Sequence, residues 1–266
     1  MPPLSLGPAA YERALAAAGL KDITVFHRQS TGSTNDDARA MVASRSPLLE
    51  NAAAIFVAET QTQARGRGSN VWSAPRGSIS LTITIPGVEL SHLGVLPLGV
   101  GASVAGALRQ LGANAFVKWP NDVLIDKLKV CGVLCESSLM AGTARVYIGI
   151  GINVEADAAD APLPAHATTL EARGITADRA SLVADITSRV LDLVRGQASG
   201  ASVVADWKAL SVPWWGEEVS MLDSEVEKCC VLLDVNPDGH LVVRDEGGVV
   251  RSLVSGEVRQ LRAARA

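Results

Sequence analysis

The sequence has 266 residues, of which 48% are hydrophobic and 20% are charged, and its formal net charge is -4. This length suffices for one sizeable domain and a small second one, and the apolar content excludes an intrinsically disordered chain. The slightly acidic balance opposes broad nucleic-acid binding, which requires a basic surface.

The N-terminal region predicts a helix and a strand. Pro8 to Ala18 is expected to be helical, because proline suits a first turn and Gly19 suits the end of a helix. Ile23 to His27 is a predicted strand. No room remains before this region for a helix-turn-helix module, so binding of DNA through an N-terminal domain is not expected. The first eight residues lack a signal-peptide pattern, and no apolar run approaches the ~18 residues of a membrane span.

The segment Ser30 to Asp37 is dense in residues that cap helix N-termini, and a helix to about Ser44 is predicted after it. Two interpretations stay open. Ser33 or Thr34 could simply cap the helix, or the free amides and hydroxyls at its N-terminus could bind a polar ligand.

A polar, glycine-rich segment, Gln61 to Trp72, lies between two predicted strands at Ala53–Ala58 and Ser78–Ile85. Its arginines, Arg65 and Arg67, alternate with glycines. Glycine allows close approach of the backbone, and arginine offers a fixed charge with a planar fork of donors. The segment therefore predicts a cationic loop that grips an anion, and the flanking strands oppose the alternative of an RNA-binding tail.

The next elements predict a sheet backed by an apolar helix at Leu93–Leu111. Residues 115–126 are expected to form a strand that is broken by Pro120 and then resumes, and Val130–Leu139 and Val146–Val154 are two further strands. In the last strand Gly149 and Gly151 lie on one face, where either a ligand or a β-bulge would explain them.

The C-terminal part predicts two helices and then a change of pattern. Arg179–Val194 and Ala201–Leu210 read as helices, whereas the residues after Gly216 form short strands separated by turns. Four or five strands in about fifty residues suggest a small SH3-like barrel. The predicted domains are residues 1–212 and 213–266.

The cysteines and histidines indicate neither a zinc site nor a nucleophilic hydrolase. No C-x-x-C pair and no G-x-S-x-G elbow occurs, and the four histidines are scattered. Reduced thiols are expected, in a cytoplasmic compartment. A mitochondrial location stays open, although Glu12 and Asp22 are acidic residues that mitochondrial signals usually avoid.

Five motifs along the chain together resemble the biotin–protein ligases (holocarboxylase synthetases). In order they are Gly32-Ser33-Thr34-Asn35; Gln61 with Arg65-Gly66-Arg67-Gly68-Ser69-Asn70-Val71-Trp72; Lys118-Trp119-Pro120-Asn121-Asp122-Val123; Lys129-x-x-Gly132-Val133-Leu134; and Gly149-x-Gly151-x-Asn153. The resemblance spans about residues 30–155, and the C-terminal segment ending in Gly256-Glu257 is similar to the family's closing strand.

The resemblance implies a fold and a reaction. The expected fold is α+β, with a mixed, mostly antiparallel sheet flanked by helices, like the class II synthetases, and a small C-terminal SH3-like barrel. The expected enzyme uses ATP to convert biotin to biotinyl-5′-AMP and then transfers biotin to a lysine of a carboxylase carrier domain. The loop departs from the bacterial pattern at Ala64 and Asn70 and is closest to eukaryotic members. A ligase without a DNA-binding repressor domain is expected.

The resemblance also assigns site residues. Lys129, Arg67 and Arg65 would neutralise charge during catalysis, with Lys129 as the central cation and Lys118 as a structural competitor. The biotin-binding residues would be Ser33, Thr34, Asn35, Gln61, Arg65, Gly66, Lys129, Gly132, Gly149 and Gly151. The nucleotide-binding residues would be Arg67, Asn70, Trp72, Asn121, Asp122 and Asn153. Mg²⁺ would accompany ATP on Asp122. Segment 65–68 would be disordered when empty and would close over the adenylate.

Two other functions stay open. A lipoate– or octanoate–protein ligase shares the expected fold, but the Arg-Gly-Arg loop and the Lys-Trp-Pro-Asn-Asp motif favour biotin. A non-catalytic protein that binds the adenylate or an RNA is opposed by the presence of Lys129, Asp122 and Asn121 and by the net acidity. A homodimer, the acceptor's identity and a general base for the transfer step are not determined.

Overall fold

The computed structural model of the protein describes residues 6–68, 70–72, 75–155, 163–196, 198–223 and 226–260. The strands are β1 (Thr24–Thr31), β2 (Ala54–Gln61), β3 (Ile79–Glu89), β4 (Ala115–Lys118), β5 (Asp122–Ile125), β6 (Leu128–Met140), β7 (Thr143–Ile152), β8 (Glu218–Asp223), β9 (Val226–Val235), β10 (Leu241–Asp245), β11 (Val250–Leu253) and β12 (Glu257–Gln260). The α-helices are α1 (Pro8–Ala17), α2 (Thr34–Ala43), α3 (Leu96–Gln110), α4 (Arg179–Arg195) and α5 (Gly200–Ala209). Short 3₁₀ turns occupy Pro47–Leu49, Leu90–His92 and Glu171–Arg173.

The first seven strands form one mixed sheet in the order β1-β2-β3-β7-β6-β5-β4. β1 and β2 are parallel, and every other neighbouring pair is antiparallel. This arrangement confirms the predicted α+β class with a mostly antiparallel sheet.

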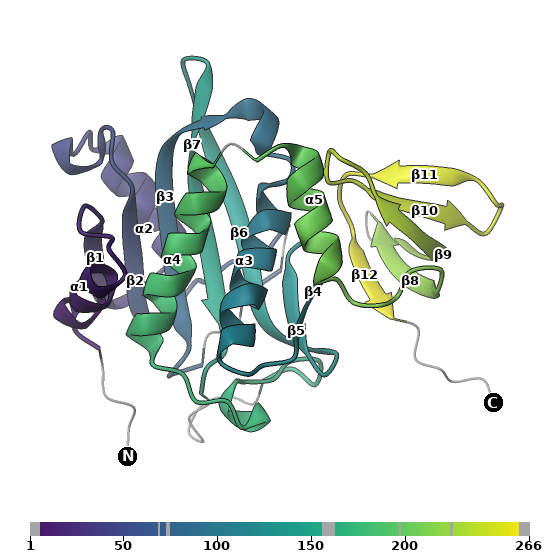
Figure 1. Ribbon diagram of the computed structural model, residues 1–266, viewed down its shortest axis with the longest axis horizontal. Helices are drawn as coiled ribbons and strands as arrows, with labels where there is room; N and C mark the ends of the chain where they lie inside the picture. The colour runs from purple at the N-terminus through teal and green to yellow at the C-terminus, as the bar shows by residue number, and fades with distance from the viewer. Residues whose placement is uncertain are drawn as a thin grey trace.

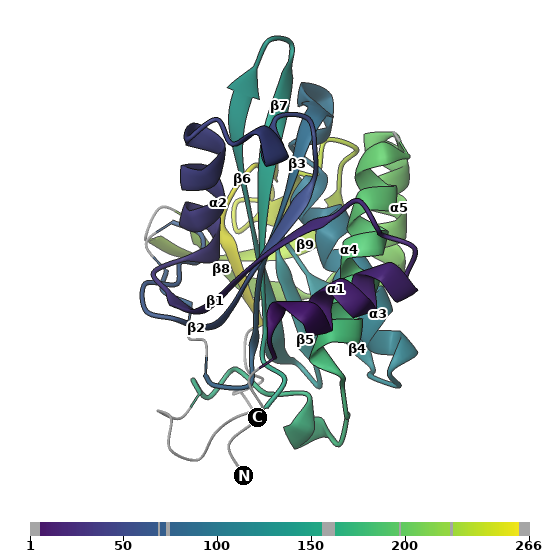
Figure 2. The same cartoon turned by 90° about the vertical axis from the view of Figure 1, so that its left-hand side faces the viewer.

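The sheet is covered by helices on both faces (Figure 2). On one face α4 packs against both α1 and the apolar helix α3, and α3 also packs against α5, whereas α2 covers part of the other face (Figures 1 and 2). The central strand β3 alternates between the two sides. Ile79, Leu81 and Ile83 join the hydrophobic core, and the serines and threonines between them are also buried. A polar, covered face of the sheet therefore lies on the side of α2.

The last five strands form a separate antiparallel sheet in the order β11-β10-β9-β8-β12, beside α5 and β4 (Figure 1). The SH3-like barrel closure predicted for this region stays a prediction, as does the division at residues 212 and 213. Buried residues of the two sheets belong to one continuous hydrophobic cluster, to which Trp119 and Trp207 contribute from the first part and Val258 from the second.

The chain reverses at Pro120, where the sequence predicted a strand that is broken and then resumes. The interruption is confirmed, and its direction, which the sequence left open, is a reversal, because β4 and β5 pair antiparallel with Lys118 opposite Asp122. The peptide bond between Trp119 and Pro120 is cis. Proline lacks the amide proton that a continuing strand would need, so the chain turns here and brings a lysine against an aspartate.

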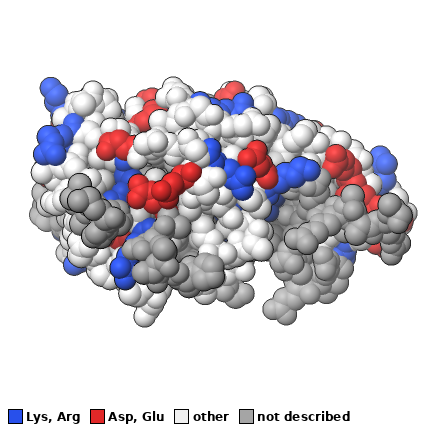
Figure 3. Space-filling model, turned by 90° about the horizontal axis from the view of Figure 1, so that it is seen from below, with Lys and Arg blue, Asp and Glu red and all other residues white. Residues whose placement is uncertain are grey.

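Charged side chains of both signs are interspersed on the face seen in Figure 3, without one extended basic surface. No described helix is long and apolar enough to cross a membrane. None of the four cysteines is bridged, and Cys131 and Cys230 are buried.

Candidate active site

Strand register builds the floor of the candidate site. Four residues lie in one cross-strand row, since Ser80 is opposite Gly151, Gly151 is opposite Gly132, and Gly132 is opposite Asp122. Residues directly opposite one another project from the same face of a sheet. Two glycines in the middle of the row leave the backbone open to close approach, with a hydroxyl at one end and a carboxylate at the other.

A β-bulge turns Lys129 onto the same face. The register between β5 and β6 shifts, so that Val123 pairs with Cys131 while Leu124 pairs with Lys129. The extra residue re-aims the lysine. A Cβ atom on Gly132 would lie 3.3 Å from Lys129 Nζ, which places the amine beside the glycines. The Lys129 backbone is also fixed, because its N–H donates to His166 and its carbonyl accepts from Thr168.

Asp122 joins two lysines at the end of the row. Its Oδ1 lies 2.6 Å from Lys129 Nζ, and its Oδ2 lies 2.9 Å from Lys118 Nζ. Burial works to raise the pKa of Asp122, but the ammonium groups of Lys118 and Lys129 outweigh it and hold the pKa below its usual value. Two ammonium groups and one carboxylate leave a net positive charge, which suits an anionic reactant.

A short hairpin, which begins at Ala64 and ends at Trp72, covers the glycines of this row. The segment folds back on itself, because the Trp72 N–H donates to the Ala64 carbonyl and the Gly66 N–H donates to the Asn70 carbonyl. Gly68 makes the turn with φ 60°. Trp72 points inward, and its ring atoms would lie 2.5 Å from a Cβ on Gly151. Lys129 Nζ is 5.5 Å from the centre of the same ring.

Buried polar atoms without partners gather around this row. Among the described residues they include the indole Nε1 of Trp72, the hydroxyls of Ser78 and Ser80, and Oδ1 of Asn153. Native proteins leave few buried polar atoms unpaired. Unpaired donors and acceptors around a glycine floor indicate a site that a polar ligand completes.

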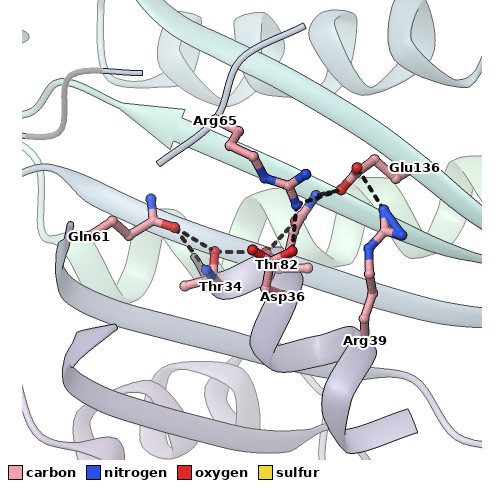
Figure 4. Close-up of polar contacts among 8 residues, drawn as sticks. Thr34, Asp36, Arg39, Gln61, Arg65, Thr82 and Glu136 are labelled. Carbon is pink, nitrogen blue, oxygen red and sulfur yellow. Dashed lines mark hydrogen bonds and ion pairs between the residues drawn. The ribbon is translucent and has the colours of Figure 1, made fainter. Parts of the chain in front are cut away.

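A second polar group links α2 to β2 and β3 (Figure 4). Gln61 Oε1 accepts the Thr34 N–H at 2.8 Å, at the start of α2. Thr82 Oγ1 lies 2.8 Å from Thr34 Oγ1 and 2.6 Å from Asn35 Oδ1. Ser33, the residue before the helix, does not cap it with its side chain. Capping by the Ser33 side chain is therefore wrong, because Gln61 accepts the helix N-terminal amide instead, and the binding of a polar ligand here stays a prediction.

Acidic residues hold the arginine of the hairpin (Figure 4). Arg65 Nη2 lies 2.5 Å from Asp36 Oδ1 and 3.7 Å from Glu136 Oε2. Glu136 also binds Arg39 at 2.7 Å and accepts from Asn35 Nδ2 at 2.6 Å. Arg65 is therefore attached to α2 and β6 rather than directed at Lys129.

The structure brings together part of the predicted set. Lys129, Asp122, Gly132, Gly151 and Trp72 share one face of the sheet, and Thr34, Asn35, Gln61 and Arg65 form the adjoining polar group. Their roles in binding and catalysis remain predictions.

Other predicted site residues contact protein groups instead. Gly149 makes room for a side chain, since a Cβ there would lie 2.8 Å from Asn35 Oδ1. Asn121 donates to the Val133 carbonyl, and Asn153 donates to the Thr168 carbonyl. Arg67 donates to the Gly256 carbonyl at 3.3 Å, which connects the hairpin to the segment before β12. Gly66 and Asn70 serve the turn of the hairpin through their main chains.

Asp122 does not fit the predicted magnesium site. Both carboxylate oxygens face ammonium groups, and a divalent cation would be repelled by the same two lysines. No cluster of three or more metal-binding side chains occurs among the described residues. Asp122 therefore holds its two lysines rather than a metal ion.

Sequence reasoning missed Ser80, Thr82 and Glu136. The signal was the alternation of hydroxyl residues along 78–84, which normally marks a solvated face. Here Ser78, Ser80, Thr82 and Thr84 are at most 3% exposed, and α2 packs against β3. Buried hydroxyls on a central strand indicate a polar site rather than a surface.

Comparison with known proteins gives concordant results. Residues 28–153 match the Biotin/lipoate A/B protein ligase family. The biotin–[acetyl-CoA-carboxylase] ligase of Mycobacterium tuberculosis is 26% identical over 256 residues, covering 93% of this chain and 92% of that protein. The bifunctional ligase/repressor BirA of Salmonella typhimurium is 30% identical over 217 residues, covering 78% of this chain and 66% of BirA.

The solved structures agree on the fold. The biotin protein ligase of Aquifex aeolicus in complex with biotin and ATP superposes with a TM-score of 0.71 at 24% identity, covering 90% of this chain and 99% of the other. At that identity the likeness establishes the shared fold.

Proposed function

We propose that this chain, which belongs to the biotin/lipoate A/B protein ligase family, is an ATP-dependent biotin–protein ligase. It would join biotin to AMP and then pass biotin to a lysine of an acceptor protein. The observation that carries the proposal is the position of Lys129, whose amine lies beside the glycine row and under the indole of Trp72.

The first step brings two anions together. A carboxylate oxygen of biotin attacks the α-phosphorus of ATP, a new P–O bond forms, and the bond to the β-phosphate oxygen breaks to release pyrophosphate. Lys129 would contact the carboxylate and the α-phosphate as negative charge moves between them. Asp122 holds the amine in place, and Lys118 on the other carboxylate oxygen keeps the local charge positive.

The second step transfers the acyl group. The lysine amine of the acceptor attacks the anhydride carbonyl, AMP leaves, and the amine loses a proton to become an amide. Positioning near Lys129 would supply much of the acceleration, because the anhydride is already activated. The hairpin 64–72 would cover the anhydride and exclude water that would hydrolyse it.

The test is the release of pyrophosphate from labelled ATP in the presence of biotin. Lys129→Ala should lower this rate by about 100-fold, as expected when one transition-state contact to a developing charge is removed. Arg67→Ala should lower adenylate formation and increase leakage of the intermediate. Lys208→Ala is a matched control, since that lysine lies on α5, pairs with Asp234 of β9, and is remote in sequence from the motifs. Wild-type burst kinetics in both site variants would refute the assignment.

The same preparation separates the alternatives. Biotin with ATP should raise the melting temperature more than lipoate or octanoate with ATP, whereas the reverse order would identify a lipoate-type ligase. A protein that only binds the adenylate would release no pyrophosphate.

Several finer features stay predictions of the sequence. They are carboxylase carrier domains as acceptors, magnesium entering with ATP, a cytoplasmic location, the absence of a DNA-binding role, the eukaryotic-like loop and a homodimer.

A further inference from the structure

We propose that the carboxylate of Glu136 fixes the direction of a buried chain of hydrogen bonds, and that this chain makes the hydroxyl of Thr34 an acceptor. A site built in this way selects acids that offer a ring N–H, such as the ureido group of biotin, over acids that do not. This inference deepens the proposed ligase function and rests on it. Glu136 acts through Asn35 and Thr82, so it is a positioning residue.

The chain begins at a carboxylate that can only accept. Arg39 lies 2.7 Å from one oxygen of Glu136 and Arg65 lies 3.7 Å from the other, so the group is paired with two guanidinium ions. An ionised carboxylate has no proton to donate. The Asn35 atom that lies 2.6 Å from Glu136 is therefore the amide nitrogen. This contact fixes the orientation of the amide and directs Asn35 Oδ1 to Thr82.

The protons of the two threonine hydroxyls are assigned by the next two contacts, first that of Thr82 and then that of Thr34. Asn35 Oδ1 carries no proton, and its distance of 2.6 Å from Thr82 Oγ1 requires Thr82 to donate. A hydroxyl has one proton, so Thr82 cannot also donate to Thr34. The contact of 2.8 Å between the two threonine hydroxyls is therefore made by the proton of Thr34.

The distances oppose the alternative in which the Thr34 hydroxyl donates to Gln61 instead of Thr82. Thr34 Oγ1 is also 3.2 Å from Gln61 Oε1, which already accepts the Thr34 N–H at 2.8 Å. Two hydroxyl protons must serve three oxygen–oxygen contacts, so one contact lacks a proton. The contact of 3.2 Å tolerates this best, whereas contacts of 2.6 and 2.8 Å between two acceptors would be repulsive.

This assignment of protons determines which hydrogen-bonding group a ligand must present to Thr34. Once its proton is directed to Thr82, the Thr34 hydroxyl presents only lone pairs and can accept an N–H. A ring oxygen in the same place would meet acceptor against acceptor. Thr82 is fully buried and Asn35 is 4% exposed, so water cannot repair a reversed order. The chain therefore penalises a ligand that lacks the donor.

The experiment measures calorimetric dissociation constants for biotin and for its two cyclic carbamate analogues, in which one or the other ureido N–H is replaced by oxygen. In the wild type, one analogue should bind about 100-fold more weakly than biotin. Thr82→Val frees the Thr34 proton to meet a ligand oxygen, so that ratio should fall about tenfold. Thr82→Ser keeps the hydroxyl and should keep the ratio.

Glu136→Gln provides an independent variant at a partly exposed position. The new amide can donate to Asn35, the chain can then run in either direction, and the ratio should again fall about tenfold. Asp37→Asn is the control, because it removes a charge from α2 that pairs with Arg28 and does not belong to the chain. Should Thr82→Val fail to fold, Glu136→Gln decides.

The outcomes separate this inference from the proposed function. A wild-type protein that binds biotin and forms the adenylate, with the same ratio in all four variants, would overturn the chain and leave the ligase intact. A wild-type protein that does not bind biotin would overturn both.

Discussion

At the scale of single residues, the charge of Asp122 makes stability depend on pH. Its pKa is lowered because the two lysines outweigh the effect of burial. A carboxylate with a lowered folded-state pKa contributes stability above its unfolded pKa and loses that contribution as the pH falls through the folded pKa.

Asp122→Asn should therefore destabilise the protein by about 3 kcal/mol near neutral pH, because two lysines lose their buried partner. The difference in unfolding free energy between wild type and variant should stay constant down to about pH 4 and shrink below it. Urea unfolding over this pH range provides the measurement. A difference that grows on acidification would show that the ion pairs do not stabilise the fold.

The part of the candidate site that lies within sequence motifs could be predicted. Lys129, Trp72 and the glycines were expected together and lie together. The partners of Arg65 were not predictable, because Asp36 and Glu136 are about 30 and 70 residues away and meet it only through the packing of α2 on the sheet. The bulge that turns Lys129 inward is likewise a property of pairing between strands, which one strand's sequence does not reveal.

At the scale of elements, α1 is attached by a small buried polar group. Tyr11 packs against His27 of β1, and Glu59 of β2 joins His27 at 3.3 Å to Arg179 of α4 at 3.2 Å. Burial, together with the charge of Glu59, raises the pKa of Tyr11 to about 12. A phenol with a raised pKa contributes stability below its unfolded pKa and loses it as the pH rises through the folded pKa.

The wild type should consequently lose about 2 kcal/mol more than Tyr11→Phe between about pH 9 and about pH 12, because only the tyrosine must ionise in a buried place. Chemical unfolding of both proteins at several alkaline pH values gives the comparison. Equal losses would mean that Tyr11 reaches water without disturbing α1.

Elements were easier to predict than their directions. The helices at α1, α3, α4 and α5 begin and end within three residues of the expected positions, because proline, glycine and apolar periodicity mark them. The reversal at Pro120 was missed, since a proline predicts an interruption but not the direction in which the chain leaves. The strand order of the sheet follows from pairings between distant segments, which local patterns do not specify.

At the scale of the whole molecule, the two sheets depend on each other. Trp119 donates its indole N–H to the Gly239 carbonyl at 3.0 Å, and the ring of Trp207 lies edge-on to Trp215 at 6.3 Å. Trp119 and Trp207 are at most 3% exposed in the complete chain. Removing the second sheet would expose both of them.

A chain ending at residue 212 should therefore melt at least about 10 °C below the full chain, or lose cooperative unfolding, because two large aromatic side chains enter water. Calorimetry of the two proteins tests this. An unchanged transition in the shortened chain would show that the first sheet is an independent unit. Loss of the contact between Arg67 and Gly256 would add an effect on the hairpin itself.

The position of Trp72 has a consequence for the rate at which the protein can bind its substrates. Its indole lies against Gly151, so in the proposed ligase the ring would occupy part of the space that the adenylate needs. In the proposed ligase the ring would have to move before a reactant could bind there, and the free energy of that movement would weaken the observed affinity. At high substrate concentration the speed of capture should thus level off at the opening rate of the hairpin, independent of how often molecules collide with it.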